Sequence, residues 1–68
     1  MKEVVSFGED IHGKNQWYLT KQGVKIECEE VVMDALYDLW YKSPHSYSES
    51  RSDGSTVYKV IEPIKIEL

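Results

Sequence analysis

The segment EEVVMDALYDLWYK, residues 29–42, decides the fold, because it carries the periodicity of an amphipathic helix. Its apolar residues recur at i, i+3, i+4 and i+7, at Val32, Ala35, Leu36 and Leu39. Ser43 and Pro44 follow, and the residue before a proline resists the α region. The sequence therefore predicts a helix from about Glu29 to about Lys42.

Short β-prone segments precede this helix. They are Lys2–Phe7, Gln16–Thr20 and Val24–Cys28. In the third segment apolar and charged residues alternate, as in a half-buried strand. A polar loop is predicted at Gly8–Asn15, and a tight connection at Lys21–Gly23. The sequence thus predicts three strands before the helix.

A hairpin is predicted after the helix. Asp53–Gly54 suits a type I′ turn that would pair Tyr47–Ser52 with Ser55–Ile61. Pro63 interrupts the second arm, which predicts an edge strand or a bulge there. The order is β-β-β-α-β-β. It predicts a single α+β domain over residues 1–68, with a small antiparallel sheet of about four to five strands and one helix packed on one face.

Composition limits the function classes. The net charge of −4 arises in residues 27–38, which hold five carboxylates and no Lys or Arg. An acidic chain is poorly suited to bind DNA or RNA through bulk charge. Cys28 is the one cysteine, so no internal disulfide can form, and no apolar run approaches the roughly 20 residues of a membrane span. With no leader segment, these features favour a cytoplasmic protein that does not contact a membrane.

The apolar side of the helix is wider than one sheet needs. With Val32 at its centre, the arc extends to Met33, Tyr37 and Trp40, beyond the roughly 100° that packs on a sheet. Two alternatives stay open for this surplus edge. The terminal strand can cover it, or a second copy of the chain can, since Met and aromatic residues are enriched at interface centres. The second alternative predicts a homodimer.

The polar side of the helix is acidic beyond its first turn. Glu30, Asp34 and Asp38 form like-charge i, i+4 pairs, each costing a few tenths of a kcal/mol. A solvated, solubilising face explains them without any partner. The functional alternative is a docking surface for a basic partner, with Tyr37 and Tyr41 beside the acids. Such a surface could also imitate nucleic-acid phosphates and act as an inhibitor.

Catalytic and metal-binding patterns are weak. Glu9, Asp10 and His12 lie together and His45 lies far away, without the spacing of a metal site. Cys28 falls on the apolar parity of its strand, and we interpret it as a buried structural cysteine. No hydroxyl has an evident base and no glycine pattern suits a phosphate. We expect no enzymatic activity, cofactor or metal.

The alternative hypothesis, from a different class of function, is a sheet that binds nucleic acid. Basic and aromatic residues are interspersed along the predicted hairpin of Gln16–Thr20 and Val24–Cys28, where the aromatic rings could stack on the bases of a single-stranded nucleic acid. These residues are Lys14, Trp17, Tyr18, Lys21 and Lys25. Trp17 and Tyr18 fall on opposite strand faces, so at least one of the two rings is expected in the core.

The leading hypothesis is a small intracellular protein–protein interaction or regulatory module. It would bind itself, as a homodimer, and an unidentified protein through the helix residues Met33, Asp34, Tyr37, Asp38, Trp40 and Tyr41. Size and charge of this kind are typical of accessory proteins, including those of phages and other mobile elements.

Overall fold

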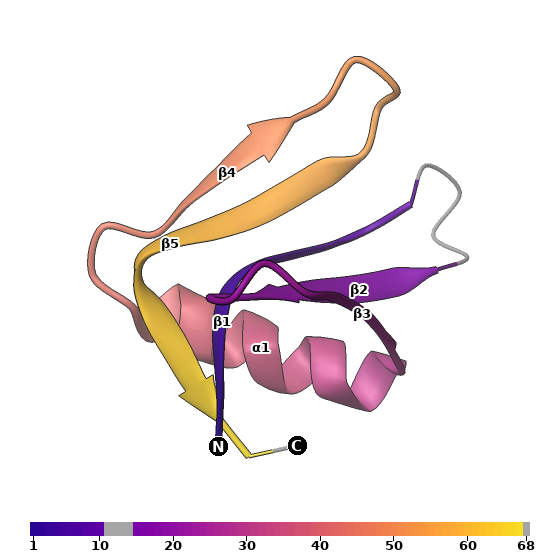
Figure 1. Ribbon diagram of the computed structural model, residues 1–68. Coiled ribbons are helices and arrows are strands. Elements are labelled where there is room, and N and C mark those ends of the chain that lie inside the picture. The colour runs from indigo at the N-terminus through magenta and orange to yellow at the C-terminus, as the bar shows by residue number, and fades with distance from the viewer. Residues whose placement is uncertain (11–14, 68) are drawn as a thin grey trace.

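The computed structural model describes residues 1–10 and 15–67, which form a five-stranded antiparallel sheet with a helix against one face (Figure 1). Its elements are β1 (Lys2–Glu9), β2 (Gln16–Thr20), β3 (Lys25–Cys28), α1 (Glu30–Lys42), β4 (Tyr47–Ser50) and β5 (Thr56–Ile66). The strand order is β3-β2-β1-β5-β4. The predicted α+β class and element order are confirmed. No helix in the described part of the chain is long and apolar enough to cross a membrane.

The first strand, β1, is the centre of the sheet and pairs with both β2 and β5. Its side chains Val4 and Phe7 are almost fully buried. Gly8 lies inside β1, so the predicted loop at Gly8–Asn15 is wrong at its start. A Cβ at Gly8 would lie 2.9 Å from the Thr56 carbonyl oxygen and 3.2 Å from the Trp17 ring. Glycine is required here by the close approach of neighbouring strands.

The β2–β3 and β4–β5 hairpins each close through a glycine in the left-handed region. Gly23 has φ 90° and its N–H donates to the Thr20 carbonyl at 2.9 Å. Gly54 has φ 92° and its N–H donates to the Arg51 carbonyl at 3.0 Å. Asp53 is not in the left-handed region, so the predicted type I′ turn is wrong. Three-residue loops ending in a left-handed glycine join the strands instead.

Strand β5 bends where Pro63 interrupts it. Lys59 pairs with Ser6 and Ile64 pairs with Val4, so residues 60–63 stand opposite Val5 alone. The predicted bulge is therefore confirmed. The first half of β5 lies between β1 and β4, whereas its second half pairs with β1 only.

Helix α1 packs on the sheet face that carries the row Ile26, Tyr18, Phe7 and Tyr58. Leu36 and Met33 are its most buried residues, and Val32 is half-buried. Ala35, expected on the apolar side, is exposed. The buried side of α1 is thus rotated from Val32 toward Met33.

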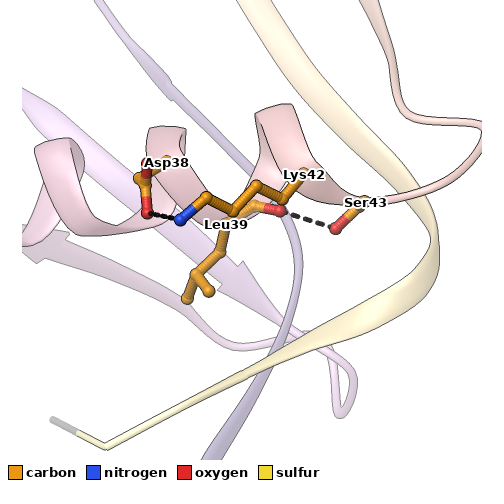
Figure 2. A network of polar contacts seen from close by, with 4 residues as sticks. All are labelled: Asp38, Leu39, Lys42 and Ser43. Atoms are coloured by element: carbon orange, nitrogen blue, oxygen red, sulfur yellow. Dashed lines mark hydrogen bonds and ion pairs between the residues drawn. The ribbon is translucent and has the colours of Figure 1, made fainter.

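The helix ends where the sequence predicts. The Ser43 hydroxyl donates to the Leu39 carbonyl at 2.7 Å, and Lys42 pairs with Asp38 at 3.0 Å (Figure 2). The Ser43 N–H donates to the Trp40 carbonyl at 3.1 Å. The two hydrogen bonds from Ser43 satisfy carbonyls of the last turn before Pro44. At the other end Glu29 makes no side-chain cap, as its residue type suggests.

Candidate interaction surface on helix α1

An aromatic cluster joins α1 to the sheet, and Tyr58 of β5 is its centre. The Tyr58 ring stacks on Phe7 at 5.2 Å between centroids. It meets Trp40 at 5.0 Å and Tyr37 at 5.5 Å in edge-to-face arrangements. Such pairs each contribute about 0.5–1.5 kcal/mol beyond their buried area. The cluster Phe7, Tyr37, Trp40 and Tyr58 therefore fixes how α1 lies on the central strands.

Trp40 is tied to the second hairpin. Its indole N–H donates to the Lys59 carbonyl at 2.9 Å and to the Tyr47 carbonyl at 3.2 Å, across the pair that links β5 to β4. Met33, its neighbour on the same helix edge, is buried. The contacts of Trp40 come from β4 and from the part of β5 that precedes Pro63, and they leave Trp40 half-buried. The alternative that a second copy of the chain covers this edge stays a prediction. Tyr37 stays 46% exposed.

The solvent side of α1 combines acids with large exposed side chains. We call it the outer face, and it consists of Glu30, Val31, Asp34, Tyr37, Asp38 and Tyr41. Tyr41 is 75% and Val31 70% exposed. Of the six predicted interaction residues, Asp34, Tyr37, Asp38 and Tyr41 lie together here, whereas Met33 and Trp40 turn toward the sheet. Val31 was missed, although it lies about 100° from Val32 around the helix, outside the predicted apolar arc.

The charges of the outer face are incompletely balanced. Asp38 pairs with Lys42, but both side chains are more than 60% exposed, so this pair contributes about 0.3–0.5 kcal/mol. Within the described residues Glu30 and Asp34 make no ion pair. No described cation therefore offsets the like-charge i, i+4 pair between them.

Two hollows among the described residues are relevant to the candidate sites. A cavity of about 120 Å³ lies between α1 and the sheet, next to the outer face. A larger hollow of about 300 Å³ lies away from the helix and is lined by Met1, Lys2, Glu3, Thr20, Gln22, Val24 and Ile26. The first is the one that adjoins the predicted interaction residues.

The residues of the nucleic-acid alternative are divided. Trp17 and Tyr18 are each 4% exposed, and Tyr18 packs in the core under α1. The Lys25 ammonium lies 4.8 Å from the Trp17 ring centroid. Lys21 instead approaches Glu3 at 3.6 Å, and Lys14 lies outside the described residues. Of the residues of this alternative that the structure describes, Lys25 is the lysine that lies against an aromatic ring, and neither the Trp17 nor the Tyr18 ring is open for stacking.

Arg51 also lies against the Trp17 ring, a contact that the sequence pattern did not indicate. Its guanidinium carbon lies 5.6 Å from the Trp17 ring centroid. The two residues are distant in the chain, and the pairing of β5 with β1 brings the second hairpin near β2. The Trp17 indole N–H is buried and has no hydrogen-bond partner among the residues that the structure describes.

The candidate chemistry at Cys28 is weak. Cys28 is half-buried, and the resulting desolvation raises the pKa of its thiol, which lowers the fraction of reactive thiolate. His12 lies outside the described residues. Across residues 1–10 and 15–67 no three His, Cys, Asp or Glu side chains are grouped to hold a metal ion.

No family model matches the chain, and no curated protein or solved structure matches it either. What the protein does has to be inferred from its own surface.

Proposed function

We propose that the protein is a small intracellular interaction or regulatory module that docks a basic protein partner on the outer face of α1. The observation that carries the proposal is the exposure of Val31 and Tyr41 on the solvent side of α1, which also carries the acids Glu30, Asp34 and Asp38. Large exposed side chains among acids supply contact area and charge selectivity on one rigid element.

A basic partner would relieve an unfavourable arrangement. Glu30 and Asp34 repel one another along the helix by a few tenths of a kcal/mol. A cation placed between them removes that cost and adds attraction, while the Tyr41 ring supplies apolar area at low cost in conformational entropy. Because the outer face is acidic, complementary charge would also accelerate association at low salt.

The test is capture from the native host with matched variants. A double variant, Val31→Ser with Tyr41→Ala, removes exposed side chains and leaves the core intact. The control is Ile61→Ser, which removes an exposed apolar side chain on β5 instead. A protein captured by wild type and by the control but lost with the double variant supports the proposal. Equal capture by all three contradicts it.

Self-association remains a second part of the proposal, with narrower support. Met33 is buried and Trp40 is hydrogen-bonded to the β4–β5 hairpin, so a homodimer interface would use the exposed side chains of Val31, Tyr37 and Tyr41. The edge strands β3 and β4 are short, and β3 carries Lys25 and Glu27, features that discourage pairing between sheet edges. Sedimentation tests the dimer, and a monomer at high concentration would end that part.

The two nucleic-acid alternatives remain predictions. A binding sheet would require the Trp17 ring, which Lys25 now lies against, to be uncovered, and a salt-dependent mobility shift of a labelled oligonucleotide would support it. An acidic inhibitor that imitates phosphates would use Asp34 and Asp38. Its captured partner would be a nucleic-acid-binding protein that oligonucleotide displaces, and failure of displacement would exclude that alternative.

A further inference from the structure

The cavity beside the outer face has an apolar floor. It is formed by Phe7 and Tyr58 of the sheet and by Met33 and Tyr37 of α1. Phe7 and Met33 are buried, and Tyr37 is partly exposed at one side. At about 120 Å³ the cavity is well above the ~10–15 Å³ that one water molecule needs. It can therefore take a side chain rather than a single water.

The rim of the same cavity is acidic, and its acids come from two elements. Glu9 ends β1, while Glu30 and Asp34 lie one turn apart on α1. The Gln16 amide donates to the Glu9 carboxylate at 3.2 Å and helps to hold it at the rim. All three acids are exposed, and within the described residues none of them makes an ion pair.

We propose that this cavity accepts one lysine or arginine side chain of the partner that docks on α1. The inference rests on the proposed function and names the chemistry that the partner must present. An aliphatic stem fits the floor of Phe7 and Met33, because long basic side chains bury their stems against apolar surface and keep the charged head in water. The head then lies among the carboxylates of the rim.

The rings add a second attraction for the cation. Tyr58 and Tyr37 meet at 5.5 Å, edge to face, beside the cavity. A cation within about 6 Å of the face of such a ring is attracted by the negative charge density of that face. The carboxylates of the rim repel a phosphate or a carboxylate, and a purely apolar side chain would leave those carboxylates without a partner. Charge complementarity therefore points to a basic side chain as the occupant.

The test uses small probes and the whole chain. Blocked Gly-Lys-Gly and Gly-Arg-Gly peptides are titrated while the Met33 methyl and the Tyr37 and Tyr58 ring signals are followed by NMR. The comparison peptide carries norleucine, which keeps the stem and lacks the ammonium group. We expect salt-dependent shifts at all three residues with the lysine or arginine peptide and none with the norleucine peptide.

Variants of the rim set the expected size of the effect. Asp34→Asn and Glu30→Gln should each raise the dissociation constant about two- to fivefold, as for a screened ion pair. The matched control is Glu62→Gln, which removes an exposed acid of β5 that belongs neither to the cavity nor to the outer face. Backbone amide spectra like those of wild type would show that each variant is folded.

Several results would overturn the inference. The first is equal NMR shifts with the lysine and the norleucine peptides. The second is an affinity of Asp34→Asn for the lysine peptide equal to that of wild type. The third is a lysine peptide that shifts the signals of Tyr41 and leaves those of Met33 unchanged. Failure of the cavity is distinguishable from failure of the proposed function. If the lysine peptide binds but capture is insensitive to the Val31 and Tyr41 variant, the docking proposal fails and the cavity remains. If capture is sensitive and no peptide binds, the cavity inference fails alone.

Discussion

Replacing Trp40 with phenylalanine separates a packing role from an interface role. The change removes the indole N–H, which donates to Lys59 and Tyr47, and keeps an aromatic ring against Tyr58. A hydrogen bond contributes about 0.5–1.5 kcal/mol net. The smaller ring also leaves unfilled volume at a half-buried site, so we expect a total loss of about 1–3 kcal/mol in the free energy of unfolding.

That loss is large for a chain of this length. At about 0.05–0.15 kcal/mol per residue, the whole protein is stable by only roughly 3–10 kcal/mol. Each kcal/mol should lower the melting temperature by about 4–8 °C. Urea unfolding followed by far-ultraviolet circular dichroism measures the change without relying on tryptophan emission, and an unchanged slope would show that the transition itself is comparable.

Tyr41→Ala is the matched control, because it removes a larger part of a side chain on the same helix at an exposed position. We expect its stability to stay within about 0.5 kcal/mol of wild type. The reasoning is refuted if Trp40→Phe unfolds like wild type. It would be refuted most clearly if that variant lost self-association in sedimentation while keeping its stability, since Trp40 would then act between chains.

Three further predictions follow from single contacts. Gly8→Ala should cost about 1–3 kcal/mol, since the new Cβ meets the Thr56 carbonyl; a neutral result in urea unfolding would mean that the strands shift apart easily. Cys28 should react with a thiol reagent more slowly than free cysteine at neutral pH, because burial raises the pKa of its thiol; a rate equal to that of free cysteine would contradict this. Hydrogen bonds from the Ser55 hydroxyl and N–H lower the pKa of Asp53, so its stabilising effect is present above the ordinary value of 3.8 and is lost as the pH falls below it. The stability difference between wild type and Asp53→Ala should shrink in acid, and a constant difference would exclude this origin.

Local signals explain what the sequence predicted well. The helix is defined by short-range periodicity and by Pro44. The β2–β3 and β4–β5 hairpins are each indicated by a glycine that follows two polar residues, at Gly23 and Gly54. Each of these features acts over a few residues, so tertiary contacts did not need to be known. The turn type was mistaken because it depends on φ at Asp53, which tolerates more than one conformation.

Strand order and helix rotation depend on contacts between distant residues. β1 is central because it pairs with β5, from the far end of the chain, and no local pattern specifies that pairing. Gly8 is of a residue type typical of loops, but it lies inside β1, where the Thr56 carbonyl oxygen leaves no room for a Cβ. The rotation of α1 is set by Tyr58 and the Lys59 carbonyl, which attract Trp40 and leave Ala35 in solvent.

Tyr37 and Tyr41 look equivalent in the sequence, since both flank the acidic side of the helix, yet their environments differ. Tyr37 contacts both Tyr58 and Trp40, so its loss would disturb folding and binding together. Tyr41 is 75% exposed. If substitution of Tyr37 weakens partner binding, the cause is either a lost contact or a disturbed fold. If substitution of Tyr41 or Val31 weakens it, a lost contact is the one explanation. The outer face is best tested with these two residues, and the cavity with Asp34, whose carboxylate lies at its rim without supporting the core.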